Sequence, residues 1–141
     1  MQKKIILYTD GGARGNPGPA GVGVSIQDGG GKELAFISEY IGETTNNQAE
    51  YEALYRALIK AKEMFGEALR DMQVEVRMDS ELVVRQLQGV YKVKNSGIKE
   101  QFERIAPLRA EYPPITFVHV RREQNARADE LVNEAIDAAG H

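Results

Sequence analysis

The first third of the chain carries three β-like segments, and the connections between them are too short for anything except hairpins. Residues 3–10, 20–28 and 33–41 are rich in apolar and β-branched side chains. Parallel neighbours need a crossover of a dozen or more residues, so these segments predict an antiparallel meander. Residues 3–10 are apolar on both alternating faces, which is typical of a central strand covered on both sides.

The pattern changes to a helical period after residue 44. Alanines recur every fourth residue at 49, 53, 57 and 61, which indicates one apolar helix face. Thr45 and Gln48 fit a capping box, so the helix is expected to begin near Asn46 or Asn47. The rest of the chain predicts a strand over 72–79 and then a short helix over 80–88, which Ser80 caps. A helix follows from residue 96 and bends or ends near Pro107. A strand over 115–120 and a last helix, capped by Asn125, complete the prediction.

The predicted order is therefore β-β-β-α-β-α-α-β-α. A meander followed by βα crossovers gives an α/β fold with a mixed five-stranded sheet and helices on both faces. The length of 141 residues fits a single domain over 1–141.

Composition narrows the class of protein further. The chain has no cysteine, which excludes disulfides and thiolate metal sites, and no run of eighteen apolar residues that would predict a membrane span. The N-terminal apolar run is too short for a signal peptide, so a cytoplasmic protein is expected. The net charge of −3 argues mildly against a large phosphate-binding surface, although "YKVKNSGIK" and "RREQNAR" are locally basic.

Four carboxylates stand at the ends and starts of the predicted elements. Asp10 and Asp79 end two strands, whereas Glu50 and Asp129 lie in the first turns of two helices. Each alone is explained as a strand end, a cap or a helix-dipole partner. Parallel pairing of the first and fourth strands would bring them together, and clustered carboxylates favour hard divalent cations such as Mg²⁺. A Ser-His-Asp triad is poorly supported by two histidines, at 119 and 141.

The glycine-rich stretch "TDGGARGNPGPAG" (9–21) is not a phosphate-binding P-loop. The Lys-Ser/Thr ending is absent, and a strand follows it instead of a helix. It is better interpreted as a hairpin connection in which Gly11 and Gly12 allow close backbone approach, with Asn16 free to face a phosphate.

Four motifs in order, "TDGGARGNPGPAG" (9–21), "TTNNQAE" (44–50), "MDSELVV" (78–84) and "NARADEL" (125–131), resemble those of type 1 ribonuclease H. The resemblance covers about residues 5–138 and agrees with the predicted element order. It implies endonucleolytic hydrolysis of the RNA strand of an RNA/DNA hybrid, giving 3′-hydroxyl and 5′-phosphate ends, with two Mg²⁺ or Mn²⁺ ions. It also implies that Asp10, Glu50, Asp79 and Asp129 are the metal-binding and catalytic acids. The implied substrate contacts are Gly11, Gly12, Asn16, Thr45, Asn46, Asn47, Gln48 and Ser80.

The chain departs from the family pattern in two places. The connection "GVYKVKNS" (89–96) lacks the extra helix and basic loop of some members, and no separate N-terminal hybrid-binding domain is seen. Weak substrate affinity, or help from oligomerisation or partners, is therefore expected. Many members also carry a histidine in a flexible loop before the last acid. Here His119 lies within a predicted strand, so Arg121, Arg122 or Glu123 is expected to assist product departure.

Two other functions remain open from the sequence. A non-catalytic hybrid- or RNA-binding module could use the same fold, but it would not need four acids beside phosphates. Another nuclease on this fold, such as a junction resolvase, is disfavoured by the complete "TTNNQAE" motif.

Overall fold

The computed structural model describes residues 3–141. Its elements follow the predicted order, with two additional 3₁₀ turns, η1 (Gly66–Asp71) and η2 (Arg122–Asn125). The strands and helices are β1 (Lys4–Ala13), β2 (Gly18–Asp28), β3 (Glu33–Thr44), α1 (Asn46–Phe65), β4 (Gln73–Met78), α2 (Glu81–Leu87), α3 (Ser96–Ala110), β5 (Ile115–His119) and α4 (Ala126–Ala138).

The five strands form one mixed sheet in the order β3-β2-β1-β4-β5. The meander β1-β2-β3 is antiparallel, and β4 and β5 extend the sheet in parallel from β1. This arrangement confirms the predicted α/β class and the predicted parallel pairing of the first and fourth strands. It makes β1 the central strand, as its two apolar faces indicated.

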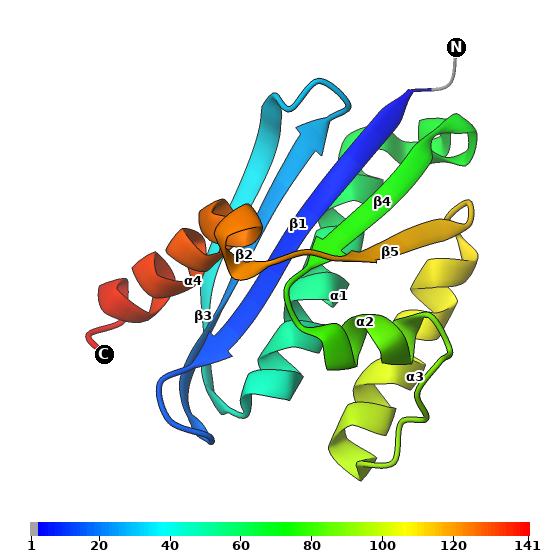
Figure 1. Cartoon of the computed structure of the whole chain (residues 1–141). Coiled ribbons are helices and arrows are strands. Elements are labelled where there is room, and N and C mark those ends of the chain that lie inside the picture. The colour runs from blue at the N-terminus through cyan, green and yellow to red at the C-terminus, as the bar shows by residue number, and fades with distance from the viewer. Residues whose placement is uncertain (1–2) are drawn as a thin grey trace.

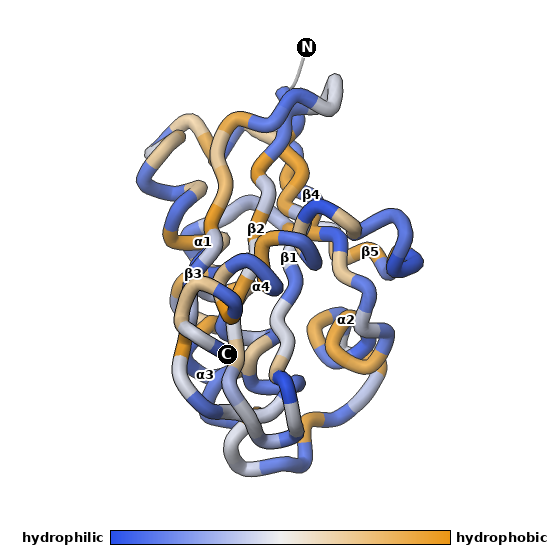
Figure 2. Tube along the Cα trace, turned by 90° about the vertical axis from the view of Figure 1, so that its left-hand side faces the viewer, coloured by the Kyte–Doolittle hydropathy of each residue, from blue (hydrophilic) through white to orange (hydrophobic). Residues whose placement is uncertain are grey.

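Helices cover both faces of the sheet, as expected (Figure 1). On one face α1 packs against β1 and β2, and α3 packs against α1. On the other face α4 lies across β2 and β3. Gly23 of β2 permits this second contact, because a Cβ there would stand 2.1 Å from the backbone oxygen of Ala128. Figure 2 shows hydrophobic segments along the strands and hydrophilic segments at the turns that join them.

The main hydrophobic core lies between the sheet and α1 to α3. Leu7, Val76 and Leu54 are fully buried in it, and the alanine face of α1 packs at 53, 57 and 61 against the sheet. Small side chains on that face allow the helix axis to lie close to the strands. The first turns of α1 are consequently held against the C-terminal part of β1, at Gly11 and Ala13.

Several element boundaries differ from the sequence predictions. β1 extends to Ala13, so Asp10 lies inside the strand and not at its end, because β2 continues to pair with it as far as Ala13↔Ala20. β3 reaches Thr44 for a similar reason, since Thr44 pairs with Gly18. α3 passes through Pro107 and ends at Ala110. Two residues later Tyr112 is buried, and its hydroxyl donates a hydrogen bond to the Leu58 carbonyl.

Within residues 3–141, no helix is both long enough and apolar enough to cross a membrane.

Candidate active site

The site forms where β1 and β4 stop pairing. Their parallel ladder ends at Tyr8↔Arg77, whereas β1 continues beside β2 for five more residues. The backbone N–H of Gly11 therefore has no β4 carbonyl to bond, and it donates to Glu50 Oε1 at 3.1 Å. A Cβ on Gly11 would stand 2.1 Å from the Ala49 backbone. The missing side chain thus allows α1 to place the Glu50 carboxylate in this opening.

Three of the four predicted acids come together at this opening. Carboxylate oxygens of Asp10, Glu50 and Asp79 all lie within 4.8 Å of one another. Asp10 comes from inside β1, Glu50 from the first turns of α1, and Asp79 from the residue after β4. Asp129, in the first turn of α4, lines the same cleft but stands outside this group of three.

The metal-free cluster resists carrying its full negative charge. Burial is the main cause that raises the pKa of Asp10 to about 7; repulsion from Asp79 and Asp129 adds to it, and a hydrogen bond with Glu50 opposes it. Burial, followed by repulsion from Asp10, also raises the pKa of Glu50 well above its usual value. Both carboxyl groups are buried, with Asp10 8% and Glu50 6% exposed. The site therefore needs either protons or cations.

The donor atoms fit a hard divalent cation. All are carboxylate oxygens, which Mg²⁺ and Mn²⁺ prefer over nitrogen or sulfur. Glu50 Oε2 is buried and has no hydrogen-bond partner among the described residues, although Oε1 of the same carboxylate is bonded to Gly11. A buried carboxylate oxygen without a partner is costly unless it binds a ligand. Its position in the acid group is consistent with a metal-binding role.

Asn125 is part of the site, which the sequence did not reveal. It was predicted to cap α4, but its side chain makes no capping bond. It is 1% exposed, and its Nδ2 donates to Asp79 Oδ2 at 3.1 Å and to the Thr9 carbonyl at 3.0 Å. The amide thus links β1 to the residue after β4 where the two strands separate. The capping prediction was wrong because tertiary partners took the side chain.

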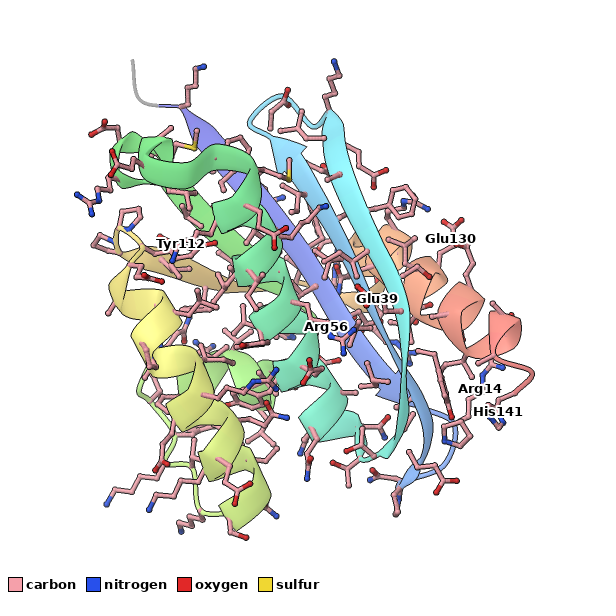
Figure 3. The ribbon with its side chains drawn as sticks, turned by 180° about the vertical axis from the view of Figure 1, so that it is seen from behind. Arg14, Glu39, Arg56, Tyr112, Glu130 and His141 are labelled. Carbon is pink, nitrogen blue, oxygen red and sulfur yellow. The ribbon has the colours of Figure 1, made fainter. Side chains whose placement is uncertain are left out.

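The acids lie in a cleft of about 490 Å³. Five of the predicted substrate contacts line it: Gly11, Gly12, Asn46, Asn47 and Ser80. Ser80 also caps α2, as predicted, by accepting from the Val83 backbone N–H at 3.3 Å. A larger cavity of about 680 Å³ lies between β3 and α1, where Arg56 bridges to Glu39, and contains none of the four acids (Figure 3).

The other three predicted contacts have structural partners. Thr45 caps α1 by accepting from the Gln48 backbone N–H at 3.2 Å, and the Gln48 side chain accepts from Thr44 Oγ1 at 3.3 Å. Asn16 is not free to face a phosphate through its carbonyl oxygen, which accepts from the Asn46 backbone N–H at 3.0 Å. Asn46 Oδ1 in turn accepts from the Ala13 N–H at 2.8 Å. These bonds join the glycine-rich loop to the start of α1.

The residues after β5 divide between the cleft and the surface. Arg122 lines the cleft, whereas Arg121 pairs with Glu123 at 3.2 Å and both are largely exposed. His119 belongs to β5, as predicted, but the strand ends at this residue and not at Val120. The His119 Nδ1 lies 3.8 Å from Glu81 Oε2. His119 does not line the cleft. Of these four residues, Arg122 alone lines the cleft that holds the acids.

Comparison with known proteins places the chain in a family. The family model described as reverse transcriptase-like matches residues 8–135. The structure of LC11-RNase H1, isolated from compost by a metagenomic approach, is 66% identical, with 98% of this chain and 99% of that chain covered and a TM-score of 0.93. The crystal structure of LC11-RNase H1 in complex with RNA/DNA hybrid, 65% identical over 97% of this chain and 99% of that one, has the same TM-score of 0.93.

Two curated relatives support the same family, and both are longer than this chain. Ribonuclease HI of Halobacterium salinarum is 40% identical, covering 96% of this chain and 66% of its own length. The bifunctional protein Rv2228c of Mycobacterium tuberculosis is 38% identical, and the chain spans 36% of it. The described fold, the order of the motifs and these likenesses agree with one another. The chain belongs to the type 1 ribonuclease H family.

Proposed function

We propose that this chain hydrolyses the RNA strand of RNA/DNA hybrids endonucleolytically, leaving 3′-hydroxyl and 5′-phosphate ends. The observation that carries the proposal is the group of three carboxylates within 4.8 Å, with Glu50 Oε2 buried and unpartnered. A pure binding protein gains nothing from such a group, because it repels phosphates and raises its own pKa values. The relative LC11-RNase H1, solved with an RNA/DNA hybrid, supports the choice of substrate.

The metal requirement is proposed as two Mg²⁺ or Mn²⁺ ions held by Asp10, Glu50, Asp79 and Asp129. When bound, such ions would lower the pKa of a water and stabilise the charge on the attacking and leaving oxygens. Hydrogen bonds within the protein hold one oxygen of a carboxylate and leave the other oxygen available for a cation. Gly11 holds Glu50 Oε1 and leaves Oε2 available, while Asn125 holds Asp79 Oδ2 and leaves Oδ1 available. Each carboxylate is therefore oriented before any ligand arrives.

The neutral polar residues at the start of α1 suit recognition of RNA. Asn46 and Asn47 line the cleft beside Glu50, and neither adds charge. Only RNA offers 2′-hydroxyls, which amides can accept from and donate to in the minor groove. We therefore assign the RNA strand to the side of the cleft formed by Asn46, Asn47 and Glu50. Arg122 is assigned to the departing 5′-phosphate.

Three further predictions accompany this function. Residues 1–141 act as a single catalytic unit, substrate affinity is weak without the basic loop, and the protein is cytoplasmic. The short α2–α3 connection, which carries Lys92 and Lys94, motivates the second of these.

The test is cleavage of end-labelled RNA/DNA hybrid, duplex RNA and duplex DNA with and without Mg²⁺, beside Asp10→Asn as the matched control. We expect Mg²⁺-dependent cutting of the hybrid's RNA strand by the wild type and retained binding without cutting by the variant. A wild type that binds hybrid but leaves it intact would instead support a non-catalytic module. Equal cutting of duplex DNA would indicate another nuclease activity on this fold.

A further inference from the structure

One cation of the cleft has no role in the function proposed above. Arg14 and Arg122 are the cations among the described residues that line the cleft. Arg122 follows β5, whereas Arg14 follows β1 and bonds to Asn133 of α4, which lines the same cleft. A cleft with four acids that receives a polyanion needs positive charge beside those acids.

Arg14 is held in place by two residues of one helix. Its Nη1 lies 2.7 Å from Asp137 Oδ1, and its Nη2 donates to Asn133 Oδ1 at 3.2 Å. Figure 3 places it beside the C-terminal part of α4. Asn133 also donates to the backbone oxygen of Asp129 at 3.1 Å. The guanidinium is therefore positioned by the same helix that carries the fourth acid.

The spacing along α4 suits a nucleic-acid strand. Asp129, Asn133 and Asp137 are each four residues apart, so Arg14 lies roughly 6–12 Å from Asp129 along the helix axis, at 1.5 Å per residue. A strand rises about 3.4 Å per nucleotide. Asn133 and Ile136 continue the cleft lining in that direction. A strand following the cleft would pass Arg14 within a few nucleotides of the acid cluster.

The existing partners of Arg14 leave it able to bind a phosphate. A guanidinium has five N–H donors, and Asn133 and Asp137 engage two of them. The ion pair with Asp137 is exposed, at 36% for the Arg14 side chain and 67% for Asp137, so it is weak and easily rearranged. A phosphate can then accept two N–H donors from the planar guanidinium.

We propose that Arg14 binds a backbone phosphate of the RNA strand, within a few nucleotides of the scissile phosphate, and thereby sets the position of the strand in the cleft. The inference rests on the proposed function, because it names one contact of that substrate. The alternative role is a purely structural link between the β1–β2 loop and α4.

The test measures hybrid binding against salt concentration in an Asp10→Asn background, where cleavage is blocked. Arg14→Gln is expected to weaken binding about tenfold and to lower the slope of log affinity against log salt by about one. Arg14→Lys should keep the slope and lose part of the affinity. Asp137→Asn removes the link but also a competing acid, so it should keep or strengthen binding.

A methylphosphonate at single positions of the RNA strand provides the second measurement. Neutralising the phosphate that Arg14 contacts should weaken binding to the parent protein and leave binding to Arg14→Gln unchanged. The proposal is overturned by an unchanged salt slope in Arg14→Gln, or by equal losses in Arg14→Gln and Asp137→Asn. A wild type that cuts hybrids normally while Arg14→Gln binds them equally well would sink this contact and leave the proposed function standing. A wild type that neither binds nor cuts hybrids would contradict both the Arg14 contact and the proposed function.

Discussion

The side-chain amide of Asn125 donates to Asp79 Oδ2 at 3.1 Å, joining two residues 46 positions apart. The same nitrogen donates to the Thr9 carbonyl, next to Asp10 in β1. Asn125 therefore fixes the distance between the strand that carries the first acid and the loop that carries the third. The Asn125 Oδ1 atom is buried and has no hydrogen-bond partner among the described residues. An unpaired buried oxygen lowers stability, so the stability of the fold alone does not explain an asparagine here.

Asn125→Ala should weaken metal-dependent cleavage more than it lowers the free energy of unfolding. Losing a residue that orients a ligand typically lowers metal affinity or activity about 10–100-fold. We expect that range for cleavage of hybrid, with the Mg²⁺ concentration for half-maximal rate shifted upwards. Gln73→Ala, at an exposed amide of β4 outside the cleft, serves as the control and should change the rate less than twofold. Equal rates for the two variants would exclude a positioning role for Asn125.

Gly11→Ala should damage both stability and the site. The added Cβ would meet the Ala49 backbone at 2.1 Å, and backbone atoms cannot move aside as a flexible side chain can. Overpacking of this kind costs about 1–3 kcal/mol or more in free energy of unfolding, and the shift would displace Glu50. Gly12→Ala is the matched control, since its Cβ would meet Val132 Cγ1 at an ordinary 3.6 Å. Urea unfolding and hybrid cleavage measure the two effects; similar stabilities for both variants would refute the packing argument.

Asp10→Asn should stabilise the metal-free protein, and the gain should depend on pH. The folded-state pKa of Asp10 is about 7, above the ordinary aspartate value of 3.8, so the folded protein binds more protons than the unfolded chain between these values. The free energy of unfolding therefore falls as pH rises from about 4 to about 7. Removing the carboxylate should gain roughly 2–4 kcal/mol at pH 8 and little at pH 4, at about 1.4 kcal/mol per pKa unit.

Urea unfolding with EDTA at the two pH values measures this gain. Asp71→Asn, at an exposed acid, is the control and should show no such pH dependence. Added Mg²⁺ should stabilise the wild type more than Asp10→Asn, because cation binding replaces the protons. A gain that is equal at both pH values would contradict the raised pKa.

His119→Ala and Arg122→Ala should differ in turnover. His119 ends β5 and is absent from the cleft lining, so its loss should change the cleavage rate less than about threefold. Arg122 lines the cleft, and its loss should slow steady-state turnover about tenfold through weaker handling of the phosphate. Single-turnover and steady-state rates on the hybrid separate chemistry from product release. If the histidine variant loses most turnover and the arginine variant none, the assignment is wrong.

The order of elements follows from local sequence signals, and three of the four predicted acids come together as expected. The four-residue alanine repeat predicted α1, and Thr45 and Ser80 cap their helices as expected. Parallel pairing of two apolar strands then predicted the meeting of Asp10 with Asp79. These predictions succeeded because periodicity and capping depend on neighbours along the chain.

Features decided by distant contacts were not predictable in this way. An asparagine before a helix is typical of a cap, yet Asn125 bonds to partners 46 and 116 residues away. Asp10 seemed to end a strand because the glycines after it lack strand propensity, but pairing with β2 carries β1 to Ala13. The separation of β1 from β4 after Tyr8 has no signature in either strand alone.

The central place of β1 has a consequence for how this protein is made. Asp10 is synthesised early, but its neighbour strand β4 begins at Gln73, and Asn125 is added more than a hundred residues after Thr9. A growing chain therefore carries the first acid long before it can assemble the site. The site stays incomplete until residues 125–129 have been added, because Asn125 bonds to Asp79 and Asp129 lines the cleft.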